Sequence, residues 1–264
     1  MPEPLRCSLN VTFQFWGAPL IESLDGAVAR GFRTVELLNP FDIELDDLER
    51  ALDERGLTVD LFNLPMGDLD AGDRGTAGEP GRRQEFRAGV ERAARVADRI
   101  GTRKVNALAG RHVEGETETA QLDCLIDQLG WAADRLADHG VQVNTEMLSP
   151  VEAPGYLLGS VDKTKAILDA LGGKVGFQLD VYHLQRAQGE LIRTIRELAP
   201  ISRHYQIADA PDRTEPGTGE INHANVLREI AATGYEGLIG CEFMPSGRSE
   251  DAFAWMEALG VEKA

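Results

Sequence analysis

The stretch GFQLDVYH (176–183) is a short apolar segment that runs directly into an acid, Asp180, with His183 close behind it. Aspartate is depleted from β-strands and is almost never fully buried without a partner. An acid at the end of an apolar strand therefore needs a physical reason. The same arrangement, an apolar run closed by a polar residue, recurs along the chain and indicates the fold.

Eight β-rich runs alternate with segments of helical period, and a glycine closes most of the helical segments before the next strand. The strand candidates are SLNVTF (8–13), TVELLN (34–39), TVDLFN (58–63), KVNALAG (104–110), VQVNTE (141–146), KVGFQLD (174–180), RHYQIAD (203–209) and GLIGCEF (237–243). This pattern predicts an α/β fold, a (β/α)8 TIM barrel formed by residues 1–264 as a single domain. A doubly wound open sheet would share much of the pattern.

The composition of the chain disfavours several classes of function. The chain has 264 residues and a formal net charge of -17, which disfavours binding to nucleic acid and to anionic membranes. Three cysteines without metal-like spacing indicate a reducing compartment, and the first residues lack an apolar leader core. We therefore expect a cytoplasmic protein that acts on a small molecule. The sequence leaves homo-oligomerisation open.

The last four predicted strands end in Glu146, Asp180, Gln206 and Glu242. In a barrel, the carboxyl ends of consecutive strands converge on one mouth, where barrel enzymes keep their sites. Three carboxylates facing one another would repel strongly unless a cation held them. With the amide oxygen of Gln206, the set is all oxygen and favours Mg²⁺ or Mn²⁺, with Co²⁺ left open. His183 could be a ligand, a substrate hydrogen-bond donor or a proton carrier.

Each of these residues also has a plainer interpretation. A single acid at a strand end is often a helix N-cap or a solubilising loop residue, and Glu36 in the second strand could be a salt-bridge partner or a support behind the ligands. The loop at 65–81 could be a lid or a surface excursion. Phe13, Phe15 and Trp16 could wall the pocket or pack in the core.

The chain contains several longer motifs, NLPMGDLDAGDRG (63–75), PGRRQEFRAGV (80–90), LDVYHLQRAQGEL (179–191), QIADAPDRTEPGTGEIN (206–222) and GYEGLIGCEF (234–243). Together these motifs resemble the hydroxypyruvate isomerase family within the xylose isomerase-like barrels. The resemblance implies a (β/α)8 barrel and a metal held by Glu146, Asp180, Gln206 and Glu242.

The resemblance also implies a reaction, the conversion of hydroxypyruvate or a related 2-oxo acid such as 2-oxo-tetronate through an enediolate. Glu146 and Glu242 would be the acid/base pair, and His183 and Arg213 would contact the substrate. A loop pairing of Arg213 with Glu215 or Asp212 is the plainer alternative. Ketose 3-epimerase, inosose-type dehydratase and a non-catalytic sugar-acid binding protein remain alternatives for the chain.

This sequence departs from the family pattern beside both catalytic glutamates. Glu146 is followed by Met147, Leu148 and Ser149, where family members often have proline, isoleucine and asparagine. Met244 stands where many members have a lysine. These departures bear on the identity of the substrate more than on the chemistry.

Overall fold

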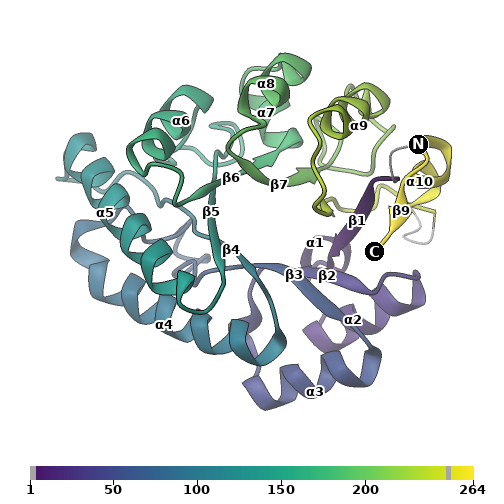
Figure 1. Ribbon diagram of the computed structural model, residues 1–264, viewed down its shortest axis with the longest axis horizontal. Helices are drawn as coiled ribbons and strands as arrows, with labels where there is room; N and C mark the ends of the chain where they lie inside the picture. The colour runs from purple at the N-terminus through teal and green to yellow at the C-terminus, as the bar shows by residue number, and fades with distance from the viewer. Residues whose placement is uncertain (1–3, 248–250) are drawn as a thin grey trace.

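The computed structural model describes residues 4–247 and 251–264, and its centre is a closed barrel of parallel strands (Figure 1). The eight barrel strands are β1 (Arg6–Asn10), β2 (Thr34–Leu37), β3 (Thr58–Asn63), β4 (Lys104–Asn106), β5 (Gln142–Glu146), β6 (Gly176–Asp180), β7 (Ser202–Ile207) and β8 (Ile239–Cys241). Each pairs with its neighbour in chain order. Because β1 pairs with both β8 and β2, the barrel is closed, and the open-sheet alternative is excluded.

Helices surround this barrel, as Figure 1 shows. They are α1 (Val11–Gln14), α2 (Leu20–Ala29), η1 (Pro40–Asp42), α3 (Leu45–Arg55), η2 (Pro80–Arg82), α4 (Arg83–Ile100), α5 (Glu118–Ala137), α6 (Val161–Ala170), α7 (Val181–Ala187), α8 (Leu191–Leu198), α9 (His223–Ala232) and α10 (Ala254–Leu259). A short strand, β9 (Glu262–Lys263), pairs with the start of β1. Within the described parts of the chain, no helix has both the length and the apolar character to cross a bilayer.

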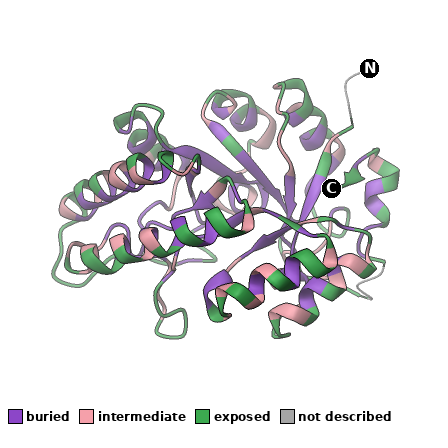
Figure 2. Ribbon diagram, turned by 60° about the horizontal axis from the view of Figure 1, so that its bottom comes forward, coloured by how far each residue is buried: buried purple, intermediate pink, exposed green. Residues whose placement is uncertain are grey.

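The expected glycine caps are present. Gly56 and Gly101, which end α3 and α4, have φ values of 59° and 74°, in the left-handed region that glycine adopts without strain. Each turns the chain from an outer helix toward the next strand. The outer helices are buried on their inner side and exposed on their outer side, whereas the eight barrel strands are mostly buried, with exposed residues near the start of some of them (Figure 2).

The first strand differs from the prediction. We expected it to span 8–13, but β1 ends at Asn10, and 11–14 forms the short helix α1. The Asn10 side chain accepts a hydrogen bond from the backbone N–H of Phe13 at 3.3 Å. This N-cap stabilises a helical turn in a segment whose β-branched and aromatic residues alone favour a strand. Helix capping therefore overrides the local strand preference here.

Polar side chains fill part of the barrel interior. Glu36 on β2 is fully buried and accepts a hydrogen bond from Ser8 Oγ at 2.6 Å. Gly240 on β8 faces the Glu36 carboxylate. A Cβ atom at Gly240 would be 2.4 Å from Glu36 Oε1, which is closer than real contacts allow. The glycine therefore provides the space that this buried carboxylate occupies.

We expect Gly240→Ala to destabilise the protein by about 1–3 kcal/mol, because the added methyl group must displace a buried, hydrogen-bonded carboxylate. The free energy of urea unfolding measures the effect. Gly81→Ala is the matched control, since a Cβ atom at Gly81 meets nothing within 4 Å. Equal stability of the two variants would show that Glu36 can move aside without cost.

Candidate functional site

A cavity of about 500 Å³ opens at the carboxyl ends of the strands. Five of the six residues predicted from the sequence line it: Glu146, His183, Gln206, Arg213 and Glu242. The sixth, Asp180, lies directly behind them, and its side chain is fully shielded from solvent. The structure therefore brings the four strand-end residues together, as the spacing of the strands predicted.

Two side-chain amides hold Glu146 in place. Asn106 Nδ2 donates to Glu146 Oε1 at 2.7 Å, and Gln178 Nε2 lies 3.4 Å from Oε2. Asn106 Nδ2 also contacts Asn63 Oδ1 at 3.2 Å. Each carboxylate oxygen of Glu146 thus has a neutral donor that orients it but does not neutralise its charge.

Asp180 is both a helix N-cap and a residue of the strand-end site, the two interpretations that its sequence position allowed. Its Oδ1 accepts from the backbone N–H of Tyr182 at 2.8 Å, so that Asp180 is the N-cap of α7. Its Oδ2 lies 3.1 Å from Arg213 Nη2 and 3.7 Å from His183 Nε2. One oxygen starts the helix and the other faces the polar residues of the site.

Arg213 connects two of the acids. Its Nη2 lies 3.1 Å from Asp180 Oδ2 and 3.4 Å from Glu242 Oε2. The guanidinium stands over the rings of Phe13 and Tyr182, at 4.3 and 5.0 Å from their centroids. The plainer alternative, a pairing with Glu215, is not what the structure has, because Glu215 instead accepts from the Ser246 N–H and hydroxyl.

A single carboxylate shapes the loop that carries Arg213. Asp209 accepts hydrogen bonds from four backbone N–H groups of this loop, those of Ala210, Gly217, Gly219 and Ile221. Arg213 itself has a φ of 56°, which is uncommon for a residue with a side chain. The Asp209 hydrogen bonds hold the loop in this conformation and direct the arginine into the cavity.

His183 is a neutral imidazole with a defined tautomer. Burial lowers its pKa well below the ordinary value, and the nearby charge of Arg213 lowers it further. Nδ1 accepts from the backbone N–H of Ser149 at 3.2 Å, so the proton is on Nε2. Nε2 is therefore the nitrogen that can donate a hydrogen bond on the Asp180 side.

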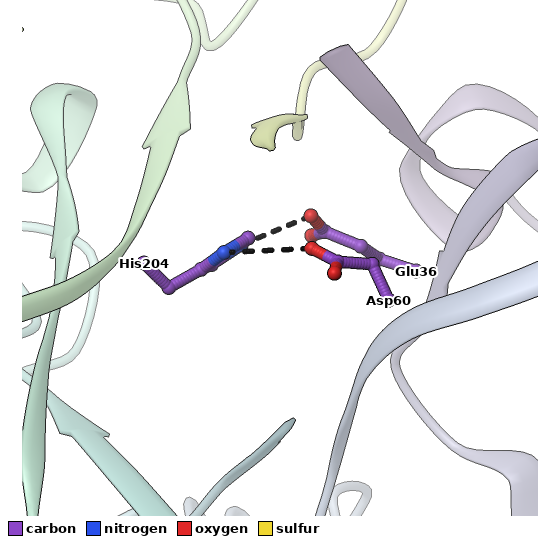
Figure 3. A group of neighbouring side chains, drawn as sticks. All are labelled: Glu36, Asp60 and His204. Atoms are coloured by element: carbon purple, nitrogen blue, oxygen red, sulfur yellow. Dashed lines mark ion pairs between the residues drawn. The ribbon is translucent and has the colours of Figure 1, made fainter. Parts of the chain in front are cut away.

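Gln206 is oriented from beneath by the buried Glu36. Gln206 Nε2 donates to Glu36 Oε2 at 2.8 Å, and Gln206 Oε1 accepts from Gln178 Nε2 at 2.8 Å. Glu36 Oε1 also lies 3.0 Å from His204 Nε2 (Figure 3). Burial raises the pKa of Glu36, but His204, Ser8 and Gln206 outweigh it and hold the pKa below its ordinary value.

Glu36, Asp60 and His204 lie close enough together to offer ligands for a metal ion, as Figure 3 shows. A lysine already supplies the positive charge to this group. Lys104 Nζ lies 2.7 Å from Asp60 Oδ2 and 3.4 Å from His204 Nδ1. This second group therefore has partners within the protein for both of its carboxylates, and it supports the strand-end site from below.

The acids of the strand-end site are not balanced in this way. Burial raises the pKa of Glu146 to about 7, and the adjacent Asp180 adds to the effect. Burial also raises the pKa of Asp180 and of Glu242, against the lowering influence of Arg213. Three buried carboxylates share one guanidinium, an excess of negative charge that a divalent cation would offset.

The donor atoms suit such a cation. Carboxylate oxygens of Glu146 and Asp180 lie within 4.8 Å of each other. Gln206 and Glu242 line the same cavity and add an amide and a carboxylate oxygen. A set dominated by carboxylate and amide oxygens fits a hard divalent metal.

Only some of the other residues singled out in the sequence line the cavity. Phe13 and Trp16 line the cavity, whereas Phe15 packs against Gly26 and under the guanidinium of Arg30. Leu148 lines the cavity. Met244 is 38% exposed and lies outside the cavity lining.

Three supporting residues were missed in the sequence. Asn63 and Asn106 close β3 and β4, and Gln178 lies within β6. Asn63 and Asn106 end apolar strands in the way that Glu146 and Asp180 do, so the same argument applied to every strand would have found them. Gln178 carries no such signal, because it interrupts an apolar strand without ending it.

Comparisons with known proteins agree with this geometry. The family model described as xylose isomerase-like TIM barrel matches residues 24–259. The chain is 36% identical to hydroxypyruvate isomerase of Escherichia coli over 96% of its length and 98% of that protein. It is 32% identical to 2-oxo-tetronate isomerase of Haemophilus influenzae, over 96% of this chain and 98% of that one. A crystal structure described as AP endonuclease, family 2, from Brucella melitensis superimposes with a TM-score of 0.91 at 36% identity, covering 98% and 99% of the two chains.

The raised pKa values predict that metal stabilises this protein in a pH-dependent way. The folded pKa of Glu146 is about 7 against an ordinary 4.5, so without metal its contribution to stability is lost as the pH rises through this range. A metal needs deprotonated ligands. We expect Mn²⁺ to raise the melting temperature more at about pH 8 than at about pH 5.5, with about 2.7 kcal/mol of stabilisation at 100 times its Kd.

Thermal unfolding with Mn²⁺ and with a chelator at both pH values measures this effect. Glu146→Gln removes one titrating group, so its stability without metal should change less with pH than that of the parent protein. An Mn²⁺-induced shift that is the same at both pH values would contradict the assignment of these carboxylates.

Proposed function

This chain belongs to the hydroxypyruvate isomerase family of the xylose isomerase-like TIM barrels and is an isomerase, and from that premise we propose its reaction. The proposed reaction interconverts hydroxypyruvate and tartronate semialdehyde, or a closely related 2-oxo acid such as 2-oxo-tetronate, through an enediolate. The observation that carries the proposal is the pair Glu146 and Glu242, two buried carboxylates with raised pKa values on one cavity.

The reaction requires proton transfer at two neighbouring carbons. A proton leaves the hydroxymethyl carbon, one is delivered to the former carbonyl carbon, and the hydroxyl proton passes between the two oxygens. Two buried carboxylates on one cavity suit this task, because each can take up a proton from carbon or return one. In the proposal one of Glu146 and Glu242 removes the proton and the other delivers it.

The proposed metal ligands are Glu146, Asp180, Gln206 and Glu242, and the proposed ion is Mg²⁺ or Mn²⁺. When bound, such an ion supplies Lewis-acid stabilisation for negative charge on the substrate oxygens. Gln206 Nε2 donates a hydrogen bond to the Glu36 carboxylate at 2.8 Å, which holds the Gln206 amide in one orientation. Asn106 does the same for Glu146 at 2.7 Å.

His183 and Arg213 are the proposed substrate contacts. The Nε2–H of the neutral His183 can donate to a substrate oxygen without bringing a further charge into the site. Arg213 reaches both Asp180 and Glu242, so its guanidinium lies beside the reacting region and can donate to a substrate oxygen there.

The alternatives share parts of this site. A ketose 3-epimerase returns the proton to the opposite face of the same carbon, and an inosose-type dehydratase also begins by enolisation. A sugar-acid binding protein needs no pair of proton carriers. An endonuclease acting on DNA has less support, because the net charge is -17 and His183 alone of the five histidines lines the cavity.

We expect the protein with Mg²⁺ or Mn²⁺ to incorporate deuterium from D₂O into hydroxypyruvate and to form the isomeric aldehyde. Glu146→Gln and Glu242→Gln should each lower the exchange rate by a factor on the order of 10² to 10⁴, because each removes one proton carrier. Proton NMR follows both the exchange and the new carbonyl species.

Glu197→Gln is the control, since this exposed residue of α8 pairs with Arg193 away from the cavity. Ketohexoses offered in parallel test the epimerase alternative. Metal binding without exchange in any short 2-oxo acid would contradict the proposed reaction and favour the binding protein.

A further inference from the structure

Two arginines near the mouth of the cavity have no acid partner among the described residues. Arg74 lines the cavity from the loop after β3. Its Nη1 donates only to backbone carbonyls, that of Asp73 at 2.6 Å and that of Leu69 at 3.4 Å. Arg111, from the segment after β4, has a buried Nε without a partner. In a chain with a net charge of -17, two neighbouring guanidinium groups without a carboxylate are unusual.

The acids closest in sequence to Arg74 do not pair with it. The carboxylate of Asp73 accepts from Arg82 Nη1 and from the backbone N–H of Asp68, each at 2.7 Å. Asp70 lines the same cavity, but the described residues include no ion pair between it and Arg74. Arg74 therefore keeps N–H groups available for an external acceptor.

The backbone around Arg74 is fixed in place. The carbonyl of Arg74 accepts from the N–H of Gly110 at 2.9 Å, and Gly75 N–H donates to Met66 O at 2.8 Å. Gly75 has a φ of 90°, and a Cβ atom there would lie 2.1 Å from Leu108 O. Only glycine permits this close approach. The loop is therefore pressed onto the barrel in a way that positions the arginine at the cavity.

Electrostatics at Arg74 favour an anion. Burial lowers the pKa of Arg74, and the positive charge of Arg111 lowers it further. The nearby charge of Asp73 acts in the opposite direction and offsets part of this, but its carboxylate is hydrogen-bonded to Arg82 and not to Arg74. A guanidinium stays protonated at neutral pH, so Arg74 and Arg111 remain two like charges beside each other. A bound anion would offset both the burial and the repulsion.

We propose that Arg74, supported by Arg111, binds the carboxylate of the substrate and so makes this isomerase prefer 2-oxo acids to neutral ketoses. The inference rests on the proposed function and adds a specificity-determining residue to it. Arg213, the other arginine in the cavity lining, is already paired with Asp180 and Glu242. Arg74 offers a planar set of donors that matches the two oxygens of a carboxylate.

The test compares ligands that differ only in the carboxylate. Hydroxypyruvate and dihydroxyacetone are the reacting pair, and D-glycerate and glycerol are the pair that is not turned over. We expect Arg74→Gln to lower kcat/KM for hydroxypyruvate and the affinity for D-glycerate by about 10- to 100-fold, while dihydroxyacetone exchange stays unchanged. Arg74→Lys should recover part of the kcat/KM for hydroxypyruvate and part of the D-glycerate affinity. Lysine keeps the positive charge but lacks the planar pair of N–H donors that a guanidinium offers to a carboxylate.

Calorimetry gives the D-glycerate affinity of the metal-loaded protein independently of turnover. Arg228→Gln, on α9, is the control for loss of one positive charge, since its guanidinium contacts Asn225. Arg111→Gln should weaken D-glycerate binding less than Arg74→Gln.

Unchanged D-glycerate affinity in a folded Arg74→Gln protein would overturn the role of Arg74, even where hydroxypyruvate is still isomerised. An equal loss for dihydroxyacetone and hydroxypyruvate would also overturn it, because the effect would then not depend on the carboxylate. If the parent protein isomerises no short acid but binds D-glycerate through Arg74, the proposed function fails and the anion site stands.

Discussion

The structure depends on the repulsion among three carboxylates that converge at the end of the barrel. Glu146, Asp180 and Glu242 lie at the ends of three strands and are buried, and Arg213 pairs with Asp180 and Glu242. Burial raises the pKa of all three acids. A bound cation would offset this repulsion, and carboxylates that face one cavity are the groups that the proposed proton transfer requires.

Below this site, the acids of the barrel interior have polar or charged partners within the protein. Lys104 pairs with Asp60, and Ser8, His204 and Gln206 surround Glu36. The two layers thus differ in charge although both contain buried acids. The lower layer is satisfied by the protein and orients Gln206, whereas the upper layer has an excess of negative charge facing the cavity. This contrast is the reason why we propose the upper layer, and not the lower one, as the site for an external cation.

The sequence predicted the barrel and the convergence of Glu146, Asp180, Gln206 and Glu242, because alternating strand and helix patterns and polar strand ends are local features. It did not predict the end of β1 at Asn10, where one side-chain cap outweighs the strand preference of the following residues. It also missed Arg74, since the absence of an acid partner is a property of the folded loop. Whether the whole chain is one domain and whether the 65–81 loop moves as a lid stay predictions.

The most direct test of the central claim is the position of a metal ion in crystals grown with Mn²⁺, located by anomalous scattering at the manganese edge. We expect one strong peak within coordination distance of oxygens from Glu146, Asp180, Gln206 and Glu242. A peak at Glu36, Asp60 and His204, or no peak at the mouth of the barrel, would contradict it.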